Sequence, residues 1–172
     1  IAANTARMNI PRNSAIDKDG NYYVDDQGNH LIRKIDTNGV ITTVAGNGTK
    51  GYYGSDTTAT HAPLNNPRAV AVDSKYNLYI SDTGNNLIKR VDANGIMSSF
   101  AGIQSSSGYS GDGGPASSAK IDFPYQIAVD ASDNIYFADN ENHVIRKIDS
   151  DGNISTVAGQ GENSLARRFG LS

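Results

Sequence analysis

One run of residues occurs three times in this chain of 172 residues, and that repetition limits the possible folds more than any other feature. The segments 11–46, 67–102 and 124–159 align without a gap. Their opening prolines lie 56 and then 57 residues apart (67 − 11 and 124 − 67), and aspartates and Ala-Gly pairs recur at the same two intervals. A shared interval at so many positions indicates one supersecondary unit that packs against its own copies.

Each copy is predicted to form four antiparallel β-strands. In the third copy, the apolar runs 127–129 and 135–137 flank a turn rich in Asp and Asn, and residues 144–148 alternate between apolar and charged side chains. Asp151-Gly152, a strong hairpin signal, precedes the fourth run. Four-stranded sheets repeated without long helices between them are typical of a β-propeller. A β-sandwich is the alternative, but it would not explain the same turn residues at a fixed interval.

We therefore predict an all-β fold in which the whole chain, 1–172, is a single propeller segment of three four-stranded blades. The blades are expected at about 11–46, 67–102 and 124–159, and the inter-blade loops at 47–66 and 103–123.

Composition excludes several classes of protein. The chain has no cysteine, so disulfides and cysteine-based zinc sites are impossible. No apolar run approaches the roughly 18 residues that a membrane-spanning helix needs. The formal net charge is −3, which argues against a general nucleic-acid binder, because such proteins usually present a basic surface.

The repeated unit resembles the NHL repeat, which is named for an Asn-His-Leu core. The run 127–147 carries the resemblance most fully, and the first copy contains the core literally as Asn29-His30-Leu31. The second copy departs from it with Asn85-Asn86-Leu87 and the third with Asn142-His143-Val144. The resemblance implies a propeller, often of six blades, and uses that range from protein or RNA binding to lyase or hydrolase chemistry.

Three blades are too few to close a ring, since propellers are built from about four to eight. We expect an open arc, half of a six-bladed ring, whose bare faces carry residues such as Tyr23, Ile32, Tyr136 and Ile145. Bare faces of this size are rare on soluble monomers. The expected partner is therefore either a second copy of the chain or the remaining blades of a longer parent. Residues 164–172 are interpreted as a diverged lead-in to a further blade.

Polar residues that recur in every copy are interpreted as scaffold, because each blade must fix its turns. Asn86 replaces the histidine of the other two copies, and a role that Asn can fill is hydrogen bonding rather than zinc ligation. We predict no metal site and no cofactor. The residues assigned to the structural repeat are Asp26, Asn29, His30, Asp82, Asn85, Asp139, Asn142 and His143.

Positions at which the copies differ are the candidates for ligand binding, because scaffold duties do not explain them. The loops that enter the innermost strands and the turns between second and third strands are expected to share one rim of the channel. Inter-blade loops rich in Gly, Ser and Tyr resemble recognition surfaces. The candidate ligand-binding residues are Arg12, Asn13, Arg68, Tyr125, Gln126, Glu141, Tyr52, Tyr53 and Tyr109.

Two Asn-x-Ser/Thr sequons begin at Asn47 and Asn153 and are candidate glycosylation sites. Low charge and abundant Asn, Ser, Thr and Gly favour an extracellular or cell-surface location. We predict a non-catalytic binding or assembly scaffold that recognises protein or glycan through its rim loops. The alternatives are a propeller lyase or hydrolase, which needs ionisable residues converging on the channel, and an RNA-binding module, which needs basic residues gathered on one face.

Overall fold

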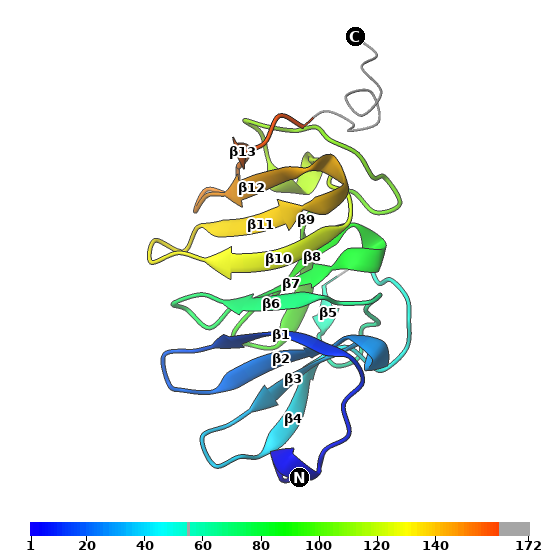
Figure 1. Ribbon diagram of the computed structural model, residues 1–172, viewed down its shortest axis with the longest axis vertical. Coiled ribbons are helices and arrows are strands. Elements are labelled where there is room, and N and C mark those ends of the chain that lie inside the picture. The colour runs from blue at the N-terminus through cyan, green and yellow to red at the C-terminus, as the bar shows by residue number, and fades with distance from the viewer. Residues whose placement is uncertain (55, 162–172) are drawn as a thin grey trace.

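The computed structural model describes residues 1–54 and 56–161, which form three antiparallel β-sheets arranged one after another along the long axis of the molecule (Figure 1). The predicted lead-in at 164–172 lies outside the described residues. The first sheet, blade 1, contains β1 (Pro11–Ile16), β2 (Tyr22–Asp26), β3 (Leu31–Ile35) and β4 (Ile41–Ala45). The second, blade 2, contains β6 (Ala69–Val72), β7 (Leu78–Asp82), β8 (Leu87–Val91) and β9 (Ile96–Ala101). The third, blade 3, contains β10 (Pro124–Val129), β11 (Ile135–Asp139), β12 (Val144–Ile148) and β13 (Ile154–Ala158).

Aspartates fix the hairpin turns in each blade. Asp17 accepts hydrogen bonds at one carboxylate oxygen from the backbone N–H groups two and four residues later, at 3.0 and 2.9 Å. Asp73 makes the same pair of bonds in blade 2, at 2.9 and 2.8 Å. A side chain that satisfies its own turn's backbone in this way mimics a turn of main chain, which is why the same residue type recurs at each position.

A short 3-10 turn joins the second strand of each blade to the third. These turns are η2 (Gln27–Asn29), η3 (Thr83–Asn85) and η5 (Asn140–Asn142). Each ends on a residue in the left-handed region: His30, Asn86 and His143 have φ of 57°, 56° and 56°. Asn and His are among the non-glycine residues that adopt this conformation most readily.

Two apolar clusters join the blades. One lies between blades 1 and 2 and includes Tyr23, Ile32 and Leu64. The other lies between blades 2 and 3 and includes Ile121 and Phe137. The sequence predicted Tyr23 and Ile32 on a bare face, and this prediction was wrong. Both residues are buried at the junction between blades 1 and 2. The β-branched and aromatic residues of the strands form the core because each sheet has a neighbour to pack against.

The segment that precedes each blade adds a short piece of strand to the blade's outer edge. Ala2 bridges Val40 in blade 1, β5 (Thr57–Thr58) pairs with β9 in blade 2, and Pro115 bridges Asn153 in blade 3. These pairings lie at the same repeat interval of 56 and 57 residues (58 − 2 and 115 − 58). Two further 3-10 turns follow them, η1 (Ala3–Thr5) and η4 (Ala116–Ser118). The repeat thus begins with the lead-in and includes part of what we expected to be loop.

Within the described part of the chain, no helix has the length and apolar character required to cross a membrane.

Candidate functional site

The innermost strands of the three blades, β1, β6 and β10, lie next to one another in the arc. β1 and β10 begin at the lead-in prolines Pro11 and Pro124, and Pro67 lies two residues before β6. The residues that follow these three prolines occupy equivalent places in the repeat. Those residues are Arg12, Arg68 and Tyr125, which differ in chemistry although the backbone around them repeats. We call this end of the arc the rim, and its residues are described below.

Asn13 connects all three blades at the rim. Its Oδ1 accepts a hydrogen bond from the Val70 N–H at 3.0 Å, and its Nδ2 donates to Gln126 Oε1 at 2.9 Å. Ala69 stands at the equivalent position in blade 2 and is fully buried. Because alanine is short, the amides of blades 1 and 3 can meet across blade 2. Two of the predicted rim residues are therefore in direct contact.

Arg68 packs against two aromatic rings of blade 3. Its guanidinium carbon lies 5.1 Å from the ring centroid of Phe123 and 4.5 Å from that of Tyr125, and Nη1 donates to the Tyr125 hydroxyl. The two rings meet edge to face. Stacking of this kind fixes a long side chain in one orientation. The sequence prediction included Arg68 and Tyr125 but missed Phe123, which lies one residue before the strand.

Arg12 donates to Gln27 Oε1 at the start of η2. Behind it, the buried Asp25 accepts the backbone N–H groups of Arg12 and Asn13 at one carboxylate oxygen. Burial raises the pKa of the Asp25 carboxyl, while the two N–H donors oppose that rise. Sequence reasoning missed Asp25. The sequence did contain a signal for Asp25: the three copies differ at this repeat position, where blade 2 has Ser81 and blade 3 has Ala138.

Glu141 is exposed on η5 and accepts a hydrogen bond from Asn140 Nδ2 at 3.0 Å. Its backbone N–H donates to the Asp122 carbonyl. Burial raises the pKa of Asp122, and the charge of Glu141 raises it further. The rim thus has arginines on blades 1 and 2 and two carboxylates on blade 3.

The three candidate tyrosines lie on the inter-blade loops, and among the described residues no hydrogen bond or ring contact joins them to the other candidate residues. The Tyr52 ring covers the buried Lys89 ammonium at 4.7 Å, and the Tyr53 carbonyl accepts a hydrogen bond from that ammonium at 3.0 Å. The Tyr109 ring covers the Arg146 guanidinium in blade 3 at 5.1 Å. Tyr52 and Tyr109 are equivalent by repeat (109 − 52 = 57). Each of these two rings therefore has an internal partner, a buried cation.

The polar residues of the structural repeat connect each lead-in to its blade. Asp82 accepts the Asn65 N–H at 2.6 Å and the Asn85 side-chain amide at 2.7 Å, and burial raises its pKa to about 6. Asp26 and Asp139 make the matching backbone bonds in the other blades, both at 2.7 Å. In blade 3 the buried Arg146 pairs with Asp139 at 3.3 Å and with Asp112 at 2.7 Å. Asn29 donates to Asp26, and Asn142 donates to the Gly108 carbonyl.

The histidine position connects one blade to the next. His30 Nδ1 accepts the Asn66 N–H at 3.2 Å, and Asn86 Oδ1 accepts the Phe123 N–H at 2.9 Å. Both bonds run from a blade to the lead-in of the following blade, so His and Asn perform the same task here.

The two sequon asparagines differ in their surroundings. Asn47 is exposed in the loop after β4, where its amide donates to the His61 carbonyl at 3.1 Å. Asn153 is half-buried, and it pairs with Pro115 at the outer edge of blade 3. Among residues 1–54 and 56–161, no group of three or more His, Asp or Glu side chains is placed to hold a metal ion.

Three radially packed sheets with lead-ins that bond from blade to blade define a segment of an NHL-type β-propeller. The family model described as "Teneurin NHL domain" matches residues 1–53 and 104–169. The chain belongs to this family.

Individual proteins similar to this chain also include teneurins. Teneurin-1 of Gallus gallus is 28% identical over 248 residues, which covers 95% of this chain and 9% of the relative. Teneurin-4 of Mus musculus is 32% identical over 161 residues, covering 83% of this chain and 6% of the relative. The chain therefore spans less than a tenth of the length of these relatives. Teneurins are cell-surface proteins, whereas the Arabidopsis thaliana protein SUPPRESSOR OF QUENCHING 1, 35% identical over 77 residues, is chloroplastic.

Solved structures show the same fold. A Bacteroides thetaiotaomicron structural genomics protein of unknown function has a TM-score of 0.65 and 27% identity, covering 75% of this chain and 32% of that chain. An auxiliary nutrient binding protein of the same organism has a TM-score of 0.64 and 23% identity, covering 84% and 37%. A streptogramin B lyase has a TM-score of 0.51 at 14% identity, covering 88% and 55%, and this likeness is one of fold alone.

Proposed function

We propose that this chain is a non-catalytic binding scaffold of the cell surface, which recognises a protein or a glycan through the rim. One observation carries the proposal: the rim residues differ from blade to blade while the backbone that holds them repeats. Arg12, Arg68 and Tyr125 share one repeat position and have two different chemistries. Repeated residues maintain the blades, so the varied ones are free to serve a ligand.

The rim is also rigid, which favours binding. Arg68 packs against two rings, and Asn13 is hydrogen-bonded to both of the other blades. Side chains that are already ordered lose little conformational entropy when a ligand arrives. Two arginines at equivalent places favour a ligand with acidic groups, because a guanidinium pairs with carboxylate or sulfate through two parallel hydrogen bonds.

The scaffold also needs further blades. We propose that blades of the same type, from a second copy or from a longer parent, complete the ring. The membership in the teneurin NHL family and the cell-surface location of teneurins support an interaction role outside the cell.

The rim can be tested with an array of neutral and acidic oligosaccharides and a panel of purified cell-surface ectodomains. We expect a hit for the full chain, and a loss of at least about tenfold in affinity for Arg68→Ala, the loss of roughly one charged hydrogen bond. Lys75→Ala is the matched control, since Lys75 is exposed at the opposite end of the blades and its side chain is 76% accessible. The proposal fails if no probe binds, or if the control loses as much affinity as the rim variant.

A further inference from the structure

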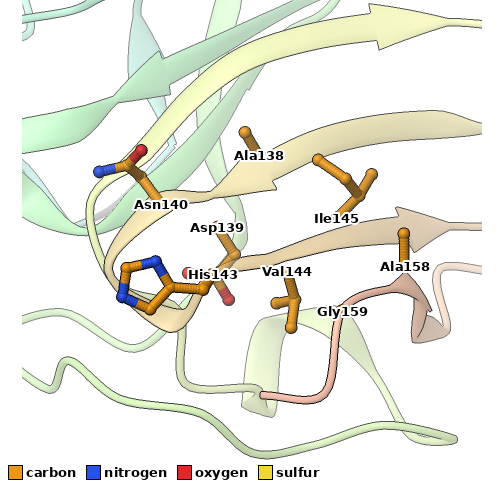
Figure 2. A pocket seen from close by; sticks show the side chains of 8 residues that line it. All are labelled: Ala138, Asp139, Asn140, His143, Val144, Ile145, Ala158 and Gly159. Carbon is orange, nitrogen blue, oxygen red and sulfur yellow. The ribbon is translucent and has the colours of Figure 1, made fainter. Parts of the chain in front are cut away.

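Cavities lie at both internal blade junctions, at the ends of the blades opposite the rim. The cavity between blades 1 and 2 has a volume of about 390 Å³, and the cavity between blades 2 and 3 a volume of about 380 Å³. Figure 2 shows a different cavity, of about 370 Å³, at the rim end of blade 3, where Asn140 and His143 stand at the turn. That cavity is lined by blade 3 alone, whereas each junction cavity has walls from two neighbouring blades.

Arg90 on β8 lines the cavity between blades 2 and 3 and has no partner of its own. Its Nε is buried without a hydrogen-bond partner, and no carboxylate of the described residues forms an ion pair with it. Lysine stands at this repeat position in the other blades. The Nζ atoms of Lys34 and Lys147 lie 5.6 and 5.9 Å from the ring centroids of Tyr23 and Tyr136.

Phe100 packs on the equivalent tyrosine of blade 2. Its ring meets that of Tyr79 edge to face, with 5.0 Å between the centroids. Valine occupies the position of Phe100 in the other blades, as Val44 and Val157. Tyr79 thus has an aromatic neighbour, and the guanidinium of Arg90 remains among the groups that line the cavity.

The facing wall is the turn between β12 and β13, where blade 3 carries an extra carboxylate. Asp149 accepts the backbone N–H groups of Asp151 and Asn153 at one oxygen, at 3.0 and 2.9 Å. Asp151 is exposed, and its own carboxylate forms no hydrogen bond or ion pair among the described residues. Asn38 and Asn94 stand at this position in the other blades. Asn-Gly and Asp-Gly favour the same hairpin turns, so the turn does not require a charge here.

A contact between the first turns of blades 2 and 3 borders the cavity. The Asp133 carboxylate accepts the Ser74 N–H at 2.9 Å and the Ser74 hydroxyl at 2.7 Å. Burial raises the pKa of the Tyr79 hydroxyl, and the charge of Asp73 raises it further. The charge of Arg90 opposes this rise and that of Asp133 adds to it, so both charges act on the same hydroxyl. The walls are therefore held together before any ligand enters, which lowers the entropic cost of binding.

We propose that the cavity between blades 2 and 3 binds a free α-amino acid with an apolar side chain. Arg90 pairs with the carboxylate of the ligand, and Asp151 pairs with its ammonium group. Phe100 and Ile135, which also line the cavity, contact the side chain. A guanidinium holds a carboxylate through two parallel hydrogen bonds. The volume lies within the range of small-molecule sites, about 300–1,000 Å³. This site is separate from the rim and goes beyond the proposed function.

The charges of the lining favour a zwitterion over an ion of one sign. The lining carries four aspartates and two basic residues, namely Asp73, Asp133, Asp149, Asp151, Lys75 and Arg90. A ligand with negative charge alone would be repelled by the carboxylates. A ligand with positive charge alone would leave the guanidinium unpaired in a partly buried place, which is costly.

The cavity between blades 1 and 2 shows that the fold does not need these two groups. There the basic residue is Lys34, which already contacts the Tyr23 ring, and the turn of blade 2 carries Asn94. The differences between the two cavities therefore place a guanidinium on one wall and a carboxylate on the other at a single junction. A ligand that needs both groups is expected at this junction.

Isothermal titration calorimetry of the full chain with L-leucine and L-phenylalanine tests the site. We expect a dissociation constant of about 1 mM or lower for at least one of them. Isocaproate has no ammonium group and leucinamide has no carboxylate. Each should bind at least about tenfold more weakly than leucine, because each loses the hydrogen bonds of one charged group.

The repeat itself supplies variants that should fold. Arg90→Lys and Asp151→Asn introduce the residues that the other blades have at these positions. Each should weaken amino-acid binding by about tenfold, while circular dichroism and the melting temperature report an intact fold. Lys34→Ala is the matched control, since it removes the equivalent cation at the other junction. It should leave the affinity within about twofold of the wild-type value.

The inference is overturned if neither amino acid binds at concentrations up to about 10 mM, or if isocaproate or leucinamide binds as tightly as leucine. It is also overturned if Lys34→Ala weakens binding as much as Arg90→Lys does. Amino-acid binding by a chain whose rim binds no probe would refute the rim proposal and leave this site standing. Rim binding without amino-acid binding would do the reverse.

Discussion

His30 shows how a single side chain can make a blade junction sensitive to pH. Its Nδ1 accepts the Asn66 N–H, and a protonated imidazole could not accept it. Burial lowers the pKa of His30, and the neighbouring Lys50 lowers it further. The folded chain therefore resists protonation of His30 more than the unfolded chain does.

We expect this bond to stabilise the fold above about pH 6.5, where histidine is neutral in both states, and to be lost as the pH falls through the folded-state pKa. Urea unfolding at about pH 7.5 and about pH 5 measures the change. His30→Asn should lose less stability on acidification, by up to about 1 kcal/mol, because an amide makes the same bond and does not titrate. Equal losses in both proteins would contradict the assignment. His61 and His143 are present in both proteins, so their contributions to the change in stability with pH cancel in the comparison.

Asp25 marks the limit of residue-level prediction. The recurring Asp, Asn and Gly residues of the turns could be predicted from the sequence, because each satisfies backbone groups a few residues away. Asp25 bonds to backbone thirteen and twelve residues earlier, across the β1–β2 hairpin. Phe123 reaches Arg68 from another blade. Contacts between residues so far apart depend on packing that local patterns do not encode.

At the scale of elements, strands with clear alternation were predictable and the short outer strands were not. β5 has only two residues, Thr57 and Thr58, and Pro115 cannot donate a backbone hydrogen bond. Neither has an apolar pattern that indicates pairing, so sequence reasoning placed both in loops. The shared interval of the lead-ins was the signal that they belong to the repeat.

The end of each fourth strand passes very close to the preceding 3-10 turn, and glycine makes that approach possible. A Cβ on Gly102 would lie 2.5 Å from the Asn86 carbonyl oxygen, and Gly102 has φ of +94°. Gly39 also has positive φ, +74°, but no atom lies within 4 Å of its Cβ position. Gly39→Ala should cost about 1 kcal/mol, and Gly102→Ala at least about 1 kcal/mol more. Chemical denaturation of both variants measures the difference, and equal costs would argue against a tight contact.

At the scale of the whole molecule, an arc of three blades has two internal junctions and two end faces without a neighbouring blade. The stability of the protein therefore depends on what covers those end faces. The two internal junctions bury their apolar faces within one chain, whereas Ile145 and Tyr22 are left at the two ends. The repeat, the blade type and the incomplete arc could be predicted because they follow from intervals and counts. Which face of a strand meets which blade could not, because that depends on register, and Tyr23 and Ile32 were misplaced for this reason.

If two copies close the ring, thermal stability depends on protein concentration. The melting temperature of the wild-type chain should rise by about 2 °C or more for each tenfold increase in concentration, because mass action favours the associated state. The Ile145→Asp chain should melt at a temperature that does not change with dilution. Differential scanning calorimetry over about two decades of concentration makes the comparison. A constant melting temperature for both proteins would argue against association.

The pairings between each lead-in and the outer edge of its blade affect how this protein can aggregate. A strand with free backbone N–H and C=O groups at a sheet edge can recruit strands from other molecules and grow into fibrils. Here Ala2, Thr58 and Pro115 occupy the beginning of that edge in each blade. Growth of a cross-β aggregate from these outer edges should therefore be disfavoured, because each edge begins with a pairing made inside the chain.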